Sequence, residues 1–290
     1  MTAAAIALFV PANRPERLVK AIHSGADAVI LDLEDGLGGA DAREGLDTLG
    51  RVLHEGLARA AAVDIGVRLP ADGSAELPSQ LRSLLAALDM VRLPKVVSAQ
   101  DAADRLAELR SSTATQGGPV PCFEITVECA AGVQAAGEIA KVAGVGRLVL
   151  GYADLAADLG LPVDWVRDAP AAMSHATATV LVAARAAGLS APSAGATTSL
   201  DAEVVERESS WARTHGCGGK SAIHPRQIPA IRAGFRPSEA EQAWASAVLS
   251  AATHDRWTGV VHGRFVDAAV IRQARQIVHK YPRDEDHDDA

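Results

Sequence analysis

Short apolar segments alternate with longer amphipathic segments along most of this chain. The run at 28–33 is continuous, aliphatic and β-branched, which is typical of a strand buried on both faces of a parallel sheet. Residues 15–25 show a helical pattern instead: a proline stands near the start, Leu18 and Ile22 share one face, and a glycine ends the segment. The repeated order of strand and helix predicts an α/β fold.

This strand-then-helix unit recurs up to about residue 235. Strands are predicted at 6–10, 28–33, 65–69, 90–93, 122–128, 147–151, 190–197 and 220–223. The helices between them are predicted at 15–25, 40–60, 76–88, 99–111, 131–141, 168–187 and 201–215. Eight successive units of this kind predict a TIM barrel, a closed parallel barrel surrounded by helices.

The pattern changes after residue 235, where no further unit of this kind follows. We expect a helix at 237–254, a short hairpin at 259–267 and a last helix at 269–280. The predicted division is a catalytic TIM barrel at 1–235, a C-terminal lid or oligomerisation extension at 236–282 and a disordered acidic tail at 283–290.

Composition excludes several classes of function. Apolar residues make up 48% of the 290 residues, so a large core is possible, and the net charge of −8 argues against non-specific nucleic-acid binding. We find no basic leader and no apolar stretch of about 18 residues, so we expect no signal peptide, no membrane span and a cytoplasmic location. The three cysteines match neither a zinc pattern nor a disulfide framework.

Polar residues follow the predicted strands at their C-terminal ends, where the active sites of such barrels lie. In chain order these residues are Asp32, Glu34, Asp35, Arg68, Lys95, Glu128, Asp154 and His224. Glu128 and Asp154 follow neighbouring strands and could share one Mg²⁺ ion, which prefers one or two carboxylates together with water and substrate oxygens. The three acids after the second strand could orient the metal's waters, and Arg68 could bind a substrate carboxylate.

Structural interpretations stay open for some of these positions. Asp35 could cap the following helix, and Lys95 could meet a phosphate or pair with an acid. For Arg92 we expect a salt bridge to a helix, and for His224, which precedes a proline, a structural turn. The residues by themselves therefore predict a barrel enzyme that depends on a metal.

Seven segments resemble, in order, the citrate lyase beta subunit and its relatives in the HpcH/HpaI aldolase superfamily. They are L-F-V-P-A-N-R-P-E-R at 8–17, G-A-D-A-V-I-L-D-L-E-D at 25–35, L-P-K-V at 93–96, V-E-C-A-A-G-V at 127–133, A-D-L-A-A-D-L-G at 153–160, A-I-H-P-R-Q-I at 222–228 and G-R-F-V-D at 263–267. The resemblance covers nearly the whole chain. It implies a TIM barrel that binds Mg²⁺ through Glu128 and Asp154, with Arg68 binding a carboxylate.

The same resemblance implies an assembly and a reaction. Relatives form homotrimers or dimers of trimers in which the C-terminal segment reaches a neighbour's active site, so Asp267 is the expected acid–base catalyst. The implied reaction cleaves a 3-hydroxy-acyl thioester, such as citryl-, malyl- or citramalyl-CoA, to an acyl thioester and a keto acid. Arg14 and Lys95 are expected to meet the phosphates of coenzyme A or of an acyl-carrier thioester.

Some positions depart from the family pattern and mark the substrate wall. Cys129 stands where relatives have threonine, Pro70 where many have asparagine, and Ala194 where aspartate is common. We expect Cys129 to contact substrate, with a thiol that donates only weakly. Two alternative functions stay open: a malate synthase-like condensing enzyme or thioesterase, and a non-catalytic paralogue that binds a keto acid or acyl-CoA.

Overall fold

The computed structural model describes residues 5–14, 16–34, 39–71, 79–114, 117–162 and 164–280. Asp35 and the predicted tail at 283–290 lie outside the described residues. The described chain forms one compact unit over Ala5–Gly234 and a second that begins at Phe235.

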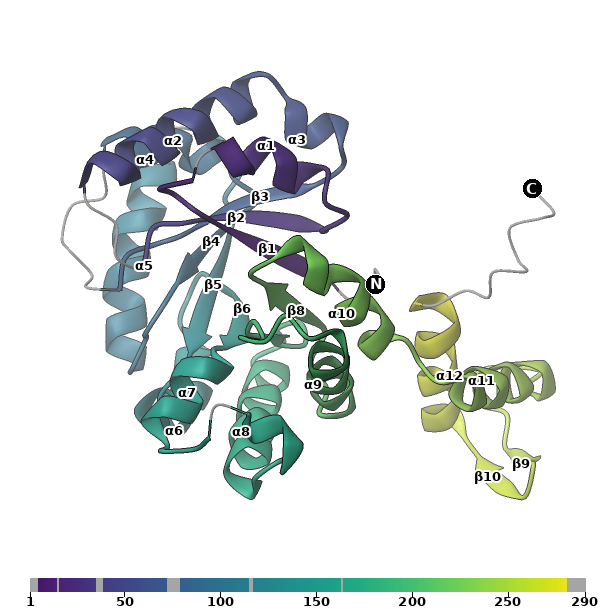
Figure 1. The fold of residues 1–290 in the computed structure, drawn as a ribbon. Coiled ribbons are helices and arrows are strands. Elements are labelled where there is room, and N and C mark those ends of the chain that lie inside the picture. The colour runs from purple at the N-terminus through teal and green to yellow at the C-terminus, as the bar shows by residue number, and fades with distance from the viewer. Residues whose placement is uncertain are drawn as a thin grey trace. The chain divides into compact units, whose positions relative to one another are not determined.

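The first unit is a closed barrel of eight parallel strands arranged in sequence order (Figure 1). The strands are β1 (Ala5–Pro11), β2 (Ala28–Asp32), β3 (Asp64–Arg68), β4 (Met90–Leu93), β5 (Cys122–Val127), β6 (Val145–Leu150), β7 (Ser193–Ala194) and β8 (Gly219–Ala222). Strand β8 closes the barrel by pairing with β1, with Ala222 opposite Leu8. The predicted TIM barrel is therefore confirmed.

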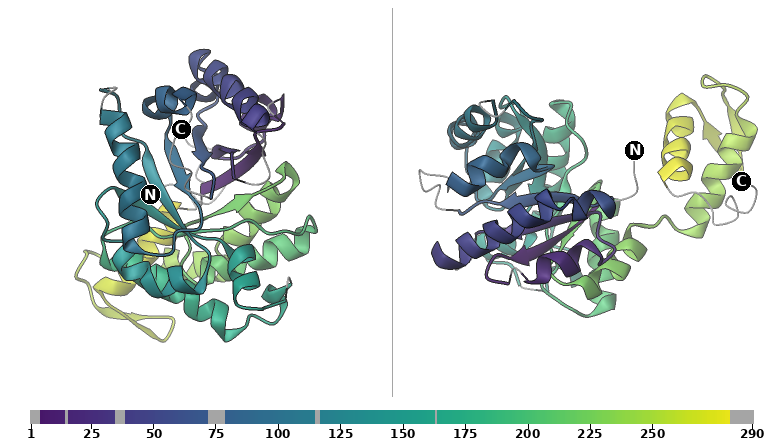
Figure 2. Two further views of the ribbon diagram at one scale, coloured as in Figure 1. Left: turned by 90° about the vertical axis from the view of Figure 1, so that its left-hand side faces the viewer. Right: turned by 90° about the horizontal axis from the view of Figure 1, so that it is seen from above.

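Helices surround the strands, as Figure 2 shows from two further directions. They are α1 (Glu16–Ile22), α2 (Gly39–His54), α3 (Leu57–Ala60), α4 (Ser79–Leu84), α5 (Ala99–Ala114), α6 (Ala130–Ile139), α7 (Tyr152–Asp158), α8 (Ala171–Ala186), α9 (Ala202–Thr214) and α10 (Ile228–Phe235). Short 3-10 turns lie at η1 (Leu85–Ala87), η2 (Trp165–Arg167) and η3 (Pro225–Gln227). No described helix has the length and apolar character needed to cross a membrane.

Three elements differ from the prediction. The helix expected at 40–60 is divided at Gly56, whose φ of +68° interrupts α-helical geometry. Strand β7 has only two residues rather than the predicted 190–197, because the segment is rich in Ala, Ser and Gly, has Thr197 as its one β-branched residue, and contains Pro192, which has no N–H to donate. Helix α7 was missed, although Tyr152, Leu155 and Ala156 are buried at helical spacing.

The second unit contains two helices and a hairpin, where the sequence predicts them. Helix α11 (Glu239–Ala251) begins with a capping box in which Ser238 and Glu241 exchange hydrogen bonds. Strands β9 (Gly259–Val261) and β10 (Arg264–Val266) pair antiparallel and lead to helix α12 (Ala268–Lys280). The unit has its own small core, made of Ala245, Val248, Val261, Val266, Ile271 and Ala274.

Candidate active site at the C-terminal ends of the barrel strands

The C-terminal ends of the strands surround a cavity of about 240 Å³ inside the barrel unit. Its lining includes four of the predicted site residues, namely Asp32, Arg68, Glu128 and Asp154. These four come from β2, β3, the residue after β5 and helix α7, so the fold brings together side chains that are far apart in sequence. Arg14, Lys95 and Cys129 are not among the residues that line this cavity.

Glu128 follows β5 directly and is only 4% exposed. Its Oε1 atom accepts a hydrogen bond of 2.5 Å from the backbone N–H of Lys95, a residue whose φ is +53°. Burial raises the pKa of this carboxyl to about 7, with the charges of Asp154 and Glu34 adding to the rise and the Lys95 N–H opposing it. A close neighbour is Gly151, where even a Cβ atom would collide with the Glu128 carboxylate. Among the described residues, the site thus holds a buried carboxylate with one hydrogen-bond donor, the Lys95 N–H.

Asp154 is exposed and lies in the first turn of α7. Asp154 follows the sixth strand, as expected, but within a helix that the sequence analysis did not predict, because β6 ends at Leu150 and α7 begins two residues later. The helix still places Asp154 in the cavity wall together with Glu128. The two carboxylates come from consecutive strand-to-helix connections, as one shared ion would need.

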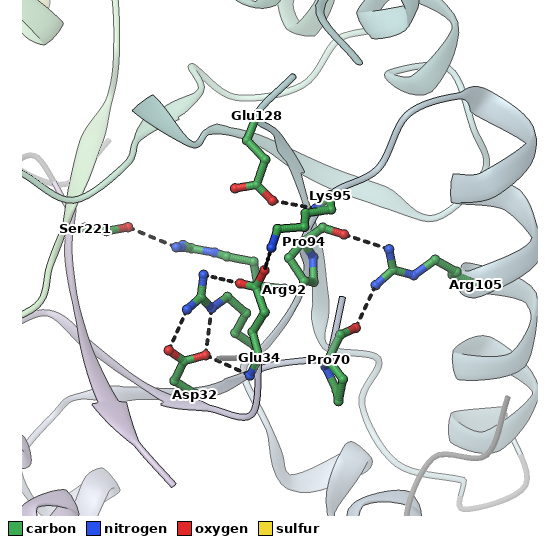
Figure 3. Close-up of polar contacts among 10 residues, drawn as sticks. Asp32, Glu34, Pro70, Arg92, Pro94, Lys95, Arg105, Glu128 and Ser221 are labelled. Carbon is green, nitrogen blue, oxygen red and sulfur yellow. Dashed lines mark hydrogen bonds and ion pairs between the residues drawn. The ribbon is translucent and has the colours of Figure 1, made fainter. Parts of the chain in front are cut away.

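Arg68 is held from two sides by the acids Asp32 and Glu34, both of which are labelled in Figure 3. Its Nε and Nη2 atoms donate to the two oxygens of Asp32 at 2.7 and 2.5 Å, and Nη1 forms an ion pair with Glu34. The guanidinium also lies 4.7 Å from the centre of the Phe9 ring. This fork-to-carboxylate pairing fixes the orientation of Arg68 at the cavity wall.

Lys95 pairs with an acid, which is one of the two roles left open by the sequence. Its Nζ atom lies 3.1 Å from Glu34 Oε1, and its side chain is 45% exposed. The hydrogen bond and charge of Glu34 raise the pKa of Lys95, with Asp154 and Glu128 adding to the effect. Arg14 is exposed in the loop after β1.

The side chains of His224 and Cys129 both cap the N-terminus of a helical segment. His224 accepts the N–H of Arg226 at the start of η3, which agrees with a structural turn. Cys129 is the N-cap of α6, where its sulfur accepts the N–H of Gly132 at 3.3 Å. The thiol that is predicted to contact substrate therefore caps the N-terminus of α6 in this structure.

The salt bridge expected between Arg92 and a helix is instead formed inside the barrel. Arg92 is 2% exposed and donates through Nε and Nη2 to Glu124 Oε2 on the next strand, at 2.9 and 2.7 Å. Its Nη1 atom donates to Ser221 on β8 at 2.9 Å. The inward direction of Arg92 follows from strand alternation, which the sequence interpretation did not apply at this position.

Asp267 is the N-cap of α12 in the C-terminal unit. Its Oδ1 atom accepts the N–H groups of Ala269 and Val270 at 2.9 and 3.1 Å. The side chain is partly exposed, and one carboxylate oxygen is committed to the helix end.

Comparison with known proteins identifies the family of this chain. The family model for HpcH/HpaI aldolase/citrate lyase matches residues 5–225. The chain belongs to this family.

Members of the family match it over nearly their whole length. A citrate lyase subunit beta-like protein of Mycobacterium tuberculosis is 33% identical over 279 residues, covering 94% of each chain. A (3S)-malyl-CoA thioesterase of Cereibacter sphaeroides is 31% identical over 282 residues, covering 94% of this chain and 93% of its own. The crystal structure of the M. tuberculosis protein CitE in complex with magnesium, acetoacetate and coenzyme A is 32% identical, with a TM-score of 0.73 over 96% of this chain and 98% of that one.

The residues at the cavity fit a magnesium ion. In the described ranges no group of three or more His, Cys, Asp or Glu residues could enclose a metal by itself. Magnesium rarely needs such a cage, because it takes one or two carboxylates and fills its other positions with water and substrate oxygens. Glu128 and Asp154 supply that number, and a cation beside Glu128 would offset the burial and repulsion that this carboxylate experiences.

Sequence reasoning missed several cavity residues. Arg92, Thr126, Thr197 and Ser221 all line the cavity, and none of them belongs to a motif singled out in the chain. A signal was present on β5, because Glu124, Thr126 and Glu128 are spaced two residues apart and must face the same side of the strand.

Proposed function

We propose that this protein is a Mg²⁺-dependent carbon–carbon lyase. It cleaves a 3-hydroxy-acyl thioester, such as citryl-, malyl- or citramalyl-CoA, to an acyl thioester and a keto acid. The observation that carries this proposal is the buried Glu128 carboxylate, which faces the cavity beside Asp154 with a single hydrogen bond in the described structure. The family membership and the magnesium-containing complex of the M. tuberculosis relative support it.

Glu128 and Asp154 would hold the metal, with Asp32, Glu34 and Asp35 orienting its waters. When bound, the ion supplies Lewis-acid polarisation of the keto acid oxygens. Arg68, oriented by Asp32 and Glu34, would bind the substrate carboxylate and stabilise negative charge that develops as the carbon–carbon bond breaks. Arg14 and Lys95 would bind phosphates of the thioester carrier.

Asp267 would exchange the proton in this reaction, reaching the cavity of a neighbouring copy in a homotrimer or dimer of trimers. The cleaved thioester leaves as an enolate whose carbon must be protonated, and a carboxyl group is a suitable acid. The cap geometry leaves the second oxygen of Asp267 without a hydrogen bond in the described structure.

Matched substitutions separate these roles of Asp267. Asparagine caps a helix about as well as aspartate, so Asp267→Asn should keep α12 intact and remove only the acid. We expect turnover to fall by about 100-fold or more, with Mg²⁺ affinity unchanged by calorimetry. Full activity of Asp267→Ala on the true substrate would show that the proposed role is wrong.

Subunit complementation tests the shared site. Glu128→Gln should abolish metal binding and Asp267→Asn should abolish proton transfer, so each homo-oligomer is expected to be inactive. If Asp267 comes from a neighbour, mixing the two variants after dissociation creates some sites that have both wild-type residues. Recovery of activity supports this arrangement, whereas activity that stays at the background level of the separate variants contradicts it.

A second candidate is thioester hydrolysis after or instead of carbon–carbon cleavage, because one relative is named (3S)-malyl-CoA thioesterase. Product analysis separates the two. A lyase turns malyl-CoA into acetyl-CoA and glyoxylate, whereas a thioesterase releases malate and free coenzyme A. Thermal stabilisation by Mg²⁺ and a keto acid, without turnover of any thioester in the panel, would favour a non-catalytic paralogue.

A further inference from the structure

The cavity has a polar floor, which we define as Arg92, Thr126, Thr197 and Ser221. All four side chains are at most 5% exposed, although three of them carry hydroxyl groups and one carries a full charge. Figure 3 shows the guanidinium of Arg92 directed toward Ser221 inside the barrel. The roles proposed above use none of these residues.

Several hydrogen-bonding groups of this floor have no partner in the described structure. The Oγ1 atoms of Thr126 and Thr197 are buried and have no hydrogen-bond partner in the described structure. Arg92 has five N–H donors, of which three are used by Glu124 and Ser221. Buried polar groups in proteins are nearly always paired, so several unused donors around one cavity indicate a ligand that supplies acceptors.

Thr126, the floor residue on β5, lies at a defined depth below the proposed metal site. Thr126 lies on β5 and precedes Glu128, the residue that follows this strand, by two positions, and both residues line the cavity. The rise along a parallel strand is about 3.3 Å per residue, and strands of such barrels tilt by about 36° from the barrel axis, so Thr126 lies roughly 5 Å deeper than Glu128. A keto acid held at the level of Glu128 and Asp154 would therefore bring a substituent of about one or two carbons to the floor.

The chemistry of the floor selects that substituent. A guanidinium offers only donors, and hydroxyl groups can donate, so the favoured occupant has acceptor oxygens and negative charge. An apolar substituent would leave the hydroxyls of Thr126 and Thr197 buried and unpaired, which costs binding free energy. Glu124 does not cancel the preference, because this carboxylate is shared between Arg92 and Arg147.

We propose that the polar floor is a second carboxylate subsite and that the keto acid handled by this enzyme is a dicarboxylate. Arg92 and Thr126 are its specificity-determining residues. The inference rests on the proposed function, since it places the other end of the keto acid at Glu128 and Asp154. Glyoxylate and pyruvate, which lack a second carboxylate, would leave the floor unsatisfied.

Calorimetry with saturating Mg²⁺ tests the subsite with three probes. Oxaloacetate and 2-oxobutyrate have the same number of carbons and differ by one carboxylate, and pyruvate is the short reference. We expect the wild-type protein to bind oxaloacetate about 10- to 100-fold more tightly than 2-oxobutyrate. Equal affinity for these two ligands would overturn the subsite.

Thr126→Val is the most conservative variant, because valine keeps the shape of threonine and disturbs no hydrogen bond in the described structure. It should weaken oxaloacetate binding by about 3- to 10-fold and leave pyruvate binding unchanged. The matched control is Thr113→Val on α5, a buried threonine away from the cavity, which should change neither. Equal weakening of both ligands by Thr126→Val would contradict the subsite.

The double variant Arg92→Met with Glu124→Gln removes the guanidinium together with its partner's charge. It should bind oxaloacetate and 2-oxobutyrate with similar affinity, and persistent preference for oxaloacetate would overturn the role of Arg92. If this variant fails to fold, Thr126→Val decides the question. The absence of Mg²⁺-dependent binding for all three keto acids would instead overturn the proposed function, and this inference with it.

Discussion

Two buried glutamates, Glu124 on β5 and Glu128 directly after this strand, lie four residues apart and have opposite surroundings. Glu124 is fully buried and accepts hydrogen bonds from two guanidinium groups, those of Arg92 and Arg147. Glu128 is 4% exposed, and in the described part of the chain it accepts one hydrogen bond, from the backbone N–H of Lys95. The pKa of Glu128 is raised to about 7, chiefly by burial.

The difference separates a carboxylate that is compensated by charges within the barrel from one that we propose binds a cation. A buried charge is tolerated when opposite charges and donors surround it, and it is costly when they do not. Glu124 meets this condition within the protein. Glu128 meets it only when something positive binds beside it, and Asp154 in the same cavity wall increases that need.

The largest expected effect comes from neutralising the carboxylate that lacks internal compensation. Glu128→Gln should reduce Mg²⁺-dependent turnover by at least about 100-fold, because a metal ligand that contributes several kcal/mol of transition-state stabilisation is lost. Calorimetric titration with Mg²⁺ and a thioester cleavage assay measure the two effects. If this variant bound Mg²⁺ as tightly as the wild-type protein, the proposal that Glu128 binds the cation would be wrong.

Neutralising the compensated carboxylate should affect stability instead. Glu124→Gln leaves the buried Arg92 without a full countercharge, and the expected loss is about 3–5 kcal/mol in the free energy of unfolding. Urea denaturation of the metal-free protein measures it. Combining Glu124→Gln with Arg92→Met should recover part of the loss, and an unchanged stability for the single variant would refute the structural role.

In the metal-free protein, the same substitution at Glu128 should raise the free energy of unfolding rather than lower it. The folded carboxyl has a pKa of about 7 against an ordinary value of 4.5, so the folded state binds the proton more tightly. Wild-type stability should therefore fall as the pH rises from about 4.5 to about 7. At about pH 8 in the presence of a chelator, Glu128→Gln should be more stable than wild type by about 1–3 kcal/mol. Denaturation at two pH values decides whether this gain disappears in acid.

The smallest stability effect is expected at Asp154. This residue is exposed in the first turn of α7, so Asp154→Asn should change the free energy of unfolding by less than about 0.5 kcal/mol. Mg²⁺ affinity should nevertheless fall by about 10-fold or more, because one of two carboxylate ligands is lost. Unchanged metal affinity would show that Glu128 does not share its ion with Asp154.

The barrel and part of its candidate site could be predicted from the chain because their signals are local. The continuous aliphatic run of β2 and the repeated unit of strand and helix require no knowledge of the tertiary structure. The pattern of helix α7 was also readable in the chain, since Tyr152, Leu155 and Ala156 are buried at helical spacing. The partners of Arg92 could not be read in this way, since Glu124 and Ser221 lie 32 and 129 residues away in sequence.

The sequence by itself determined the barrel, its helices and the hairpin, because hydrophobic periodicity and turn residues act over a few neighbouring positions. It also supplied the order of motifs that marks the family. Only the tertiary structure decided how the acids are compensated: Asp32 and Glu34 by Arg68, Glu124 by two arginines, and Glu128, within the described residues, by one backbone donor. The physical reason is that desolvation and charge pairing depend on distances across the closed barrel, which no single stretch of the chain contains.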